Sequence, residues 1–198
     1  MGRKSNNLTF LFKKIGHYSF SHMIFTQVEA LLIWLFGHFP GFIGFVIRNI
    51  IYRLLFKKLK GFAWIQPNVQ FVETNKLKVG RFFGINSGSY VNAVGGINIG
   101  DYVLIGSNVT ISSGQHQIDG SASPVFSRPI LPKEIIIEDD VWIGAGAVIM
   151  PGITLRKGTV VGACSVVTKD TTEYSVVVGA PARKIRSRII EDNIMKGN

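Results

Sequence analysis

His116 is the residue best suited to chemistry in the second half of this sequence. The chain has four histidines, and the other three lie before residue 40, so His116 stands alone in a region rich in glycine and aliphatic residues. It lies in the stretch NVTISSGQHQID, residues 108–119. Histidine titrates near neutral pH, which suits it to take a proton from a hydroxyl as a general base. The residues alone favour a surface histidine without a catalytic role.

The residues on both sides of His116 follow a repeat of six. Aliphatic or aromatic residues recur at this spacing: Ile65, Phe71; Val79, Ile85, Val91; Ile99, Ile105, Ile111; and Ile137, Ile143, Ile149, Leu155, Val161, Val167. A period of six fits neither the 3.6 of a helix nor the alternation of a strand. It does fit a triangular solenoid in which each hexad forms a short strand and a corner, with the aliphatic residue pointing inward. The sequence therefore predicts an all-β fold, a parallel β-helix, over residues 61–181.

One long interruption of this repeat contains His116. The hexads run to Ile111, fail over residues 115–134, and resume at Ile135. A loop of this length in a compact repeat is a candidate functional element, and His116 lies at its root. His116 is therefore a candidate general base. Asp119 is a candidate to orient the imidazole by accepting a hydrogen bond from its other nitrogen, and a solvated loop acid is an equal alternative.

The positive charge is concentrated at the start of the chain. Residues 1–60 carry nine Lys or Arg and one acid, Glu29, so they account for +8 of the net charge of +10. These cations flank apolar sequence, whereas a nucleic-acid-binding domain carries its cations on the folded surface that contacts the duplex. We therefore expect no nucleic-acid partner. The single cysteine, Cys164, excludes an internal disulfide and a cysteine zinc site, which fits a reducing compartment.

The apolar stretch ALLIWLFGHFPGFIGFVI, residues 30–47, has no formal charge over eighteen residues. Its glycines and its proline predict a hinge between two short helices. In the second helix Ile43, Ile47, Ile50, Ile51 and Leu54 fall on one face, and Arg48, Asn49, Arg53 and Lys57 on the other. Basic amphipathic helices of this kind lie among lipid headgroups with the apolar face down. We expect residues 24–60 to contact a membrane surface; packing within the protein or against a sister subunit, and a true span, are the alternatives.

The hexads, together with VWIGAGAVIMPGITLRKGTVVGACSVVTKD and VGAPARKI, resemble the hexapeptide-repeat acyltransferases. The resemblance covers residues 61 to about 188 and is strongest to the sugar O-acetyltransferases that act on galactosides, maltose and colanic acid. It implies a left-handed parallel β-helix, a homotrimer with active sites between subunits, and acetyl-coenzyme A as co-substrate without a metal. It says nothing about residues 1–60.

The resemblance also implies roles for individual residues. His116 takes the proton from the acceptor hydroxyl as that oxygen attacks the thioester, and the backbone N–H of Ala145, in VWIGA, stabilises the oxyanion and contacts the acetyl donor. Trp142 lines the pocket for both substrates. The remaining contacts to coenzyme A are implied at Ala163 and Thr168 through the backbone and at Lys169, Arg183 and Arg186 through charge. The resemblance implies that Asn86 binds the sugar, and Asn92 is a weaker candidate for the same role.

Some relatives have several histidines in this loop, whereas this chain has only His116. Carbonic anhydrases on the same fold bind zinc through three histidines, so this chain is not expected to be one. The domain prediction is a basic, apolar helical segment at 1–60, the β-helix at 61–181 with its loop at 115–134, and a basic tail at 182–198.

The predicted function is acetyl-coenzyme A-dependent O-acetylation of a sugar hydroxyl, in a cell-envelope or capsular polysaccharide or its lipid-linked precursor. The expected location is cytoplasmic, peripheral on the inner face of the cell membrane. Three alternatives stay open: an aminosugar N-acetyltransferase, an antibiotic acetyltransferase of the streptogramin or chloramphenicol type, and a catalytically inactive scaffold recruited to membranes through residues 1–60.

Overall fold

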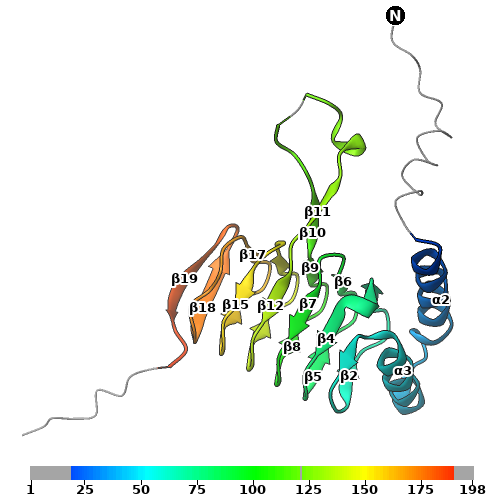
Figure 1. The fold of residues 1–198 in the computed structure, drawn as a ribbon. Coiled ribbons are helices and arrows are strands. Elements are labelled where there is room, and N and C mark those ends of the chain that lie inside the picture. The colour runs from blue at the N-terminus through cyan, green and yellow to red at the C-terminus, as the bar shows by residue number, and fades with distance from the viewer. Residues whose placement is uncertain (1–18, 121, 190–198) are drawn as a thin grey trace, which may run out of the picture.

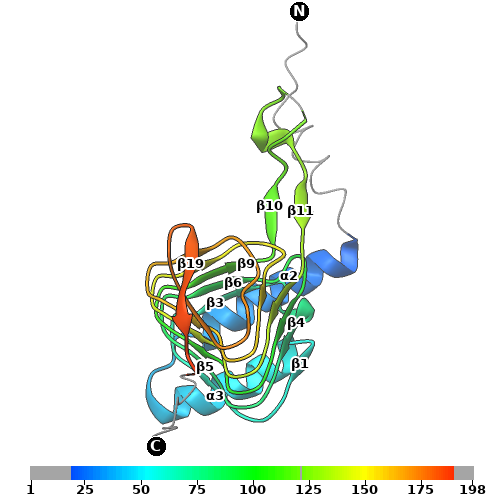
Figure 2. The same ribbon diagram turned by 90° about the vertical axis from the view of Figure 1, so that its left-hand side faces the viewer.

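The protein is a parallel β-solenoid of about six turns with two helices at its N-terminal end (Figure 1). The structure is a computed structural model, and it describes residues 19–120 and 122–189. The predicted parallel β-helix is thereby confirmed. Viewed along its axis, the solenoid has three sides, and a long arm projects from one corner (Figure 2).

Each side of the solenoid is a sheet of short strands. The first sheet contains β1 (Lys58–Leu59), β4 (Leu77–Val79), β7 (Ile97–Ile99), β12 (Ile135–Ile137) and β15 (Thr154–Leu155). The second contains β2 (Ala63–Ile65), β5 (Phe83–Ile85), β8 (Leu104–Ile105), β13 (Trp142–Ile143), β16 (Val160–Val161), β18 (Ser175–Gly179) and β19 (Ala182–Ser187). The third contains β3 (Gln70–Val72), β6 (Tyr90–Asn92), β9 (Thr110–Ser112), β14 (Val148–Ile149) and β17 (Val166–Val167). Neighbouring strands in these sheets pair in parallel, except β18 and β19, which are antiparallel.

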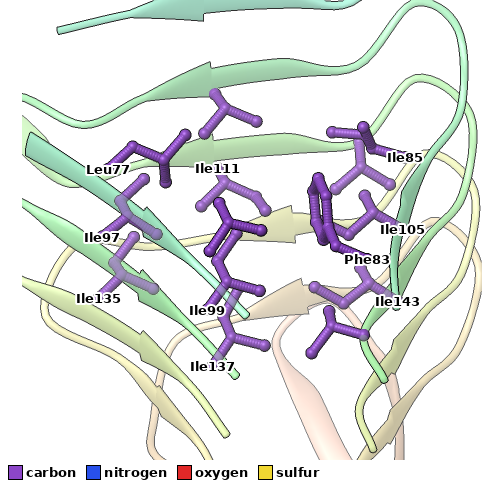
Figure 3. Packing of buried hydrophobic residues seen from close by; sticks show 14 of the residues in the cluster. Leu77, Phe83, Ile85, Ile97, Ile99, Ile105, Ile111, Ile135, Ile137 and Ile143 are labelled. Carbon is purple, nitrogen blue, oxygen red and sulfur yellow. The ribbon is translucent and has the colours of Figure 1, made fainter. Parts of the chain in front are cut away.

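The inward residues of the hexads form the core. The strand register places the inward residue of each coil beside the inward residue of the next coil. Ile137 thus lies beside Ile99 on one side and Leu155 on the other. Figure 3 shows these columns of isoleucines filling the interior. None of the fourteen hexad residues predicted to point inward exposes more than 5% of its surface. Stacked aliphatic burial is the main source of stability in such a fold.

The predicted pair of helices is also confirmed. Helix α2 (Phe20–Phe36) begins after Ser19, whose hydroxyl accepts a hydrogen bond from the His22 N–H, and it ends at Gly37. Helix α3 (Gly41–Leu55) begins directly after Pro40. Among the described residues, no helix is both long enough and apolar enough to cross a membrane.

Two residues of the predicted polar face of α3, Arg48 and Asn49, are turned toward the solenoid, contrary to the prediction that they serve a lipid surface. Arg48 and Asn49 are each only 3% exposed. The Arg48 Nε donates to the Ile65 carbonyl over 2.8 Å, and Asn49 both donates to the Ala63 carbonyl and accepts from its N–H. The physical reason is that β2 is the edge strand of its sheet, and the buried polar groups on its backbone need partners. These side chains of α3 therefore cap the open end of the solenoid.

Helix α2 attaches to the solenoid through Glu29, the acid noted in the sequence. Glu29 is 4% exposed, and its Oε1 accepts a 2.7 Å hydrogen bond from the Thr74 N–H at the start of the short helix η1 (Thr74–Lys76). With Glu29, Arg48 and Asn49 directed inward, the helical pair presents many apolar residues outward. This outer helical face comprises Phe20, Ile24, Val28, Leu31, Trp34, Leu35, Phe39, Phe42, Ile43, Val46, Ile50 and Leu54.

The sheets extend beyond the predicted limits of the β-helix at both ends. Strand β1, within the segment assigned to 1–60, pairs with β4. Strand β19, within the tail assigned to 182–198, folds back on β18. Residues 1–18 and 190–198 of those two segments lie outside the described part of the chain.

Candidate active site

His116 lies on an arm that leaves the solenoid between β9 and β12 (Figures 1 and 2). The interruption predicted as a loop begins and ends as a two-stranded antiparallel ribbon, β10 (Gly114–His116) and β11 (Ile130–Pro132). A short helix, η2 (Val125–Ser127), lies near the tip. His116 is the last residue of β10 and faces Ile130 across the ribbon. The ribbon gives the histidine a fixed backbone, which a flexible loop would not.

The His116 ring is oriented by a backbone carbonyl. Its Nδ1 lies 3.2 Å from the carbonyl oxygen of Arg128. A carbonyl oxygen only accepts hydrogen bonds, so this contact requires the hydrogen on Nδ1 and leaves the Nε2 lone pair free to take a proton. In the described residues no hydrogen bond joins Asp119 to His116, so the orienting partner is the Arg128 carbonyl and not the Asp119 carboxylate.

A second group of predicted site residues lies on the corner that joins the second sheet to the third. The backbone N–H of Asn86 donates to the Ile105 carbonyl, and that of Gly106 to the Ile143 carbonyl, so successive coils stack in register here. Ala145 and Ala163 follow the equivalent strands of the next two coils. The side chains of Asn86, Ala145 and Ala163 are exposed, so the three residues form one accessible ridge.

The backbone along this ridge is closely packed. A Cβ atom at Gly106 would lie 2.7 Å from the backbone nitrogen of Ala145, so only glycine fits there. Within the described part of the chain, the Ala145 N–H donates no hydrogen bond. Trp142 is the second residue of the VWIGA motif. It lies on β13 of the same coil and is 55% exposed. Ala145 therefore offers a fixed, available backbone donor in the same coil as the exposed Trp142.

His116 and this ridge belong to different corners of one chain. The arm leaves from the corner between the third and first sheets, whereas Asn86 and Ala145 lie between the second and third. Asn92, on β6 beside Ser112, lies on the arm's side, and its Oδ1 accepts from the Val94 N–H. One chain thus does not bring His116 together with Ala145.

A hollow at the C-terminal end gathers several cations. It has a volume of about 210 Å³ and is lined by Val167, Lys169, Asp170, Thr171, Thr172, Ser175, Val177, Ala182, Arg183 and Lys184. Two predicted contacts to coenzyme A, Lys169 and Arg183, thus lie together, while Thr168 and Arg186 do not line this hollow. Lys184, missed from the sequence, lies there too, with its Nζ 3.3 Å from the Thr172 hydroxyl. Its position next to Arg183 in VGAPARKI could have indicated from the sequence that Lys184 belongs to the same site.

Shifted pKa values occur at two other places in the fold. The Asp101 carboxylate accepts hydrogen bonds from the Arg81 N–H and guanidinium, which together hold the pKa of Asp101 below its usual value. At the helical cap, burial lowers the pKa of Arg48. Within residues 19–120 and 122–189, no group of three or more His, Cys, Asp or Glu is placed to hold a metal ion.

The hexad solenoid is the fold of solved hexapeptide-repeat acetyltransferases. Residues 134–169 match the family profile of bacterial transferase hexapeptide (six repeats), and residues 82–113 match that of the hexapeptide repeat of succinyl-transferase. The galactoside O-acetyltransferase of Escherichia coli is 34% identical over 142 residues, which is 70% of this chain and 68% of the relative. The chloramphenicol acetyltransferase of Agrobacterium fabrum is 37% identical over 116 residues, 48% of this chain and 56% of the relative.

The chain belongs to the hexapeptide-repeat acetyltransferase family. A Vibrio cholerae hexapeptide-repeat acetyltransferase, solved in complex with acetyl-coenzyme A, superposes with a TM-score of 0.78 at 29% identity, covering 87% of this chain and 91% of that one. The chain spans between 56% and 68% of the length of the first three curated relatives it matches.

Proposed function

We propose that this protein transfers an acetyl group from acetyl-coenzyme A to a sugar hydroxyl, with His116 as the general base. The observation that carries the proposal is the fixed orientation of His116, whose Nδ1 is held by the Arg128 carbonyl so that Nε2 is free to accept a proton. Similarity to a galactoside O-acetyltransferase supports the acceptor class. The structure of a relative with acetyl-coenzyme A supports the donor.

The proposed reaction has one tetrahedral intermediate. Nε2 of His116 takes the proton from the acceptor hydroxyl as its oxygen bonds to the thioester carbonyl carbon. The resulting oxyanion accepts a hydrogen bond from the Ala145 N–H, which is worth several kcal/mol in a dry site, about 3–4 in measured cases. The carbon–sulfur bond then breaks, and the sulfur of coenzyme A leaves with the proton returned by the imidazolium. The products are an acetyl ester and free coenzyme A.

We propose that the complete site forms between copies of the chain in a homotrimer. His116 and Ala145 lie on different corners of one solenoid, so a neighbouring copy must bring one to the other. The second sheet also exposes Trp64, Leu104 and Trp142 in one row across its strands, with Gly84 between Trp64 and Leu104. Exposed aromatic rows of this kind are typical of subunit interfaces. Sedimentation velocity tests the proposal, and a monomer at micromolar concentration would contradict it.

For the donor, we propose that the pantetheine arm follows the ridge of Ala145 and Ala163 and that the phosphates reach Lys169, Arg183 and Lys184. The clustering of these three cations around one hollow supports this end of the site. Phosphate groups favour such clusters of charged donors. Thr168 and Arg186, outside the hollow, stay predictions with less support.

For the location, we propose that the outer helical face rests on the cytoplasmic side of a membrane. The exposed fractions of Phe42, Ile43 and Leu54 are 79%, 71% and 73%, although the same helix buries an arginine and an asparagine. Lys57, Lys58 and Lys60 follow directly and are exposed, so they can attract anionic headgroups. Three copies of this face on a trimer would act multivalently. A lipid-linked precursor of a cell-envelope or capsular glycan is then the natural acceptor.

Flotation on vesicles tests the membrane proposal. Arg48 and Arg53 donate to solenoid carbonyls, so reversing their charge would damage the cap and not only the membrane contact. The informative variant changes Phe42, Ile43, Ile50 and Leu54 to Gln, with Ile185→Gln and Ile189→Gln as an apolar control at the far end. Wild type and control should float with phosphatidylcholine–phosphatidylglycerol vesicles, and the fourfold variant should not. Wild type that stays in the soluble fraction at low salt overturns the proposal and favours subunit packing of this face.

An acceptor screen tests the chemistry. Acetyl-coenzyme A turnover is measured with galactosides, maltose, cell-envelope glycans and their lipid-linked precursors, and with chloramphenicol as the second candidate favoured by the Agrobacterium relative. The proposal expects turnover with at least one sugar hydroxyl and none with chloramphenicol. Turnover with chloramphenicol alone would replace the sugar by the antibiotic. Turnover only with aminosugars would change the product from an ester to an amide.

A further inference from the structure

Arg128 holds the two sides of the His116 arm together through its side chain as well as its backbone. The ribbon pairs regularly only as far as His116 and Ile130, and the last backbone bond beyond it is from the Gln117 N–H to the Pro129 carbonyl, at 3.0 Å. From there to the tip, the carbonyl groups of the described residues on the His116 side have no strand opposite them. The arm therefore needs another source of order directly beyond His116.

The Arg128 guanidinium supplies that order. Its Nε and Nη2 both donate to the Ser123 carbonyl, at 3.1 and 2.8 Å. Its Nη1 donates to the carbonyls of Gln117, at 3.4 Å, and Ile118. One planar group thus joins the two residues that follow His116 to the segment near η2. A guanidinium suits this task because its donors are fixed in a fork, whereas a lysine amine is a single point of charge.

The same residue provides the carbonyl that binds the His116 ring. That contact, at 3.2 Å, determines which ring nitrogen carries the hydrogen. A carbonyl can do this only if its own peptide is held still. The Arg128 side chain holds that peptide by anchoring it to Gln117 and Ile118, which are the neighbours of the histidine in the chain. Backbone and side chain of one residue therefore act on one imidazole.

We infer that Arg128 is a positioning residue whose side chain keeps His116 in the tautomer with Nε2 free. The expected effect on kcat rests on the proposed function, whereas the expected effect on the His116 tautomer does not. Loss of the guanidinium would let the Arg128 carbonyl drift from Nδ1, and the imidazole would then populate both tautomers. The fraction with hydrogen on Nε2 cannot accept a proton there, and displacement of a catalytic group by about 1 Å costs up to about 100-fold in rate.

The test compares Arg128→Met, Arg128→Lys and wild type as full-length proteins. The readout is the ¹⁵N NMR spectrum of the imidazoles, with the His116 signals assigned as those lost in His116→Ala. Wild type should show hydrogen on Nδ1, and Arg128→Met should show both tautomers. Arg128→Lys should restore the wild-type spectrum only in part, since it lacks the fork. Arg81→Met, which removes an arginine bonded to Asp101 elsewhere on the solenoid, is the matched control and should match wild type.

Kinetics with an acceptor from the screen provide the second readout. Arg128→Met should lower kcat about 10- to 100-fold and leave KM for acetyl-coenzyme A within about twofold, because the guanidinium touches the arm and not the donor hollow. If Arg128→Met keeps the wild-type His116 tautomer, the inference is overturned whatever its kcat. If wild type shows no turnover with any acceptor, the proposed function fails, and the NMR comparison still tests the role of Arg128.

Discussion

Replacing Asn49 tests whether α3 is the structural cap of the solenoid. The Asn49 Nδ2 donates to the Ala63 carbonyl at 2.9 Å, and its Oδ1 accepts from the Ala63 N–H at 2.8 Å. Ala63 is fully buried on the edge strand β2. Asn49→Leu keeps the volume of the side chain but leaves both backbone groups of Ala63 without this partner.

The expected cost follows from those two groups. A buried donor or acceptor that loses its partner costs about 1–3 kcal/mol, so the pair together costs about 2–6 kcal/mol. For a chain of this size each kcal/mol lowers Tm by about 2–4 °C. Asn49→Leu should therefore lower Tm by at least about 4 °C in thermal unfolding followed by circular dichroism.

Asn98→Leu is the matched control for this measurement. The Asn98 side chain donates to Glu134 at 2.7 Å in an exposed position, so its loss should change stability by less than about 0.5 kcal/mol. If Asn49→Leu is as stable as Asn98→Leu, Asn49 does not face the solenoid. The polar face of α3 would then be free for lipid headgroups, as the sequence alone suggested.

Three further outcomes are expected. Gly106→Ala should impair turnover more than donor binding, because its Cβ would displace the Ala145 nitrogen, and unchanged kcat would separate Ala145 from the chemistry. Asp101→Asn should lower Tm at neutral pH, because Arg81 holds the pKa of the folded Asp101 below its usual value of 3.8. The Asp101 carboxylate therefore contributes to stability above pH 3.8, and this contribution is lost as pH falls through the lower folded pKa. A Tm deficit that stays constant down to pH 3 would refute that origin. Lys169→Ala should raise KM for acetyl-coenzyme A more than it lowers kcat, because a phosphate contact binds ground and transition states alike; an unchanged KM would place the nucleotide elsewhere.

The solenoid could be predicted from the sequence because its signal is local and repeated. Each inward residue, such as Ile143, needs only to be aliphatic and six positions from the next, and burial then aligns the coils. The sequence signal for the hinge near Pro40 is equally local, since it consists of neighbouring glycines and a proline. The ends of the solenoid were harder to predict. Leu59 on β1 continues the spacing six residues before Ile65, but it lies among the cations of the first segment. Strand β19 departs from the spacing and is recognised only through its pairing with β18.

The orientation of α3 was a different problem. The helical spacing correctly separated an apolar face from a polar one, but it does not say which face meets the protein. That choice depends on the open edge of β2, whose unpaired backbone groups attract Arg48 and Asn49. Helix α3 thus buries Arg48 and Asn49 beside Tyr52 and Leu55, and it leaves apolar residues such as Ile43 and Leu54 exposed.

The candidate site was predictable where the type of side chain indicates its role. His116, Lys169 and Arg183 stand out by type and by their place in motifs, and the structure brings the last two together in one hollow. The partner of His116 was not predictable, because it is a backbone carbonyl, twelve residues away across the arm, that any residue type could supply. Asp119 was the nearest acid in the sequence but is not the partner in space.

The most direct test of the central claim is the kcat of His116→Ala, measured beside its affinity for coenzyme A. His38→Ala is the control, since His38 is an exposed histidine between α2 and α3. If His116 is the base, His116→Ala lowers kcat by about 10²–10⁴-fold while calorimetry shows coenzyme A bound as in wild type, and His38→Ala changes neither. A His116→Ala variant within about tenfold of wild type, below the usual worth of a positioned base, would contradict the account and remove His116 from the reaction.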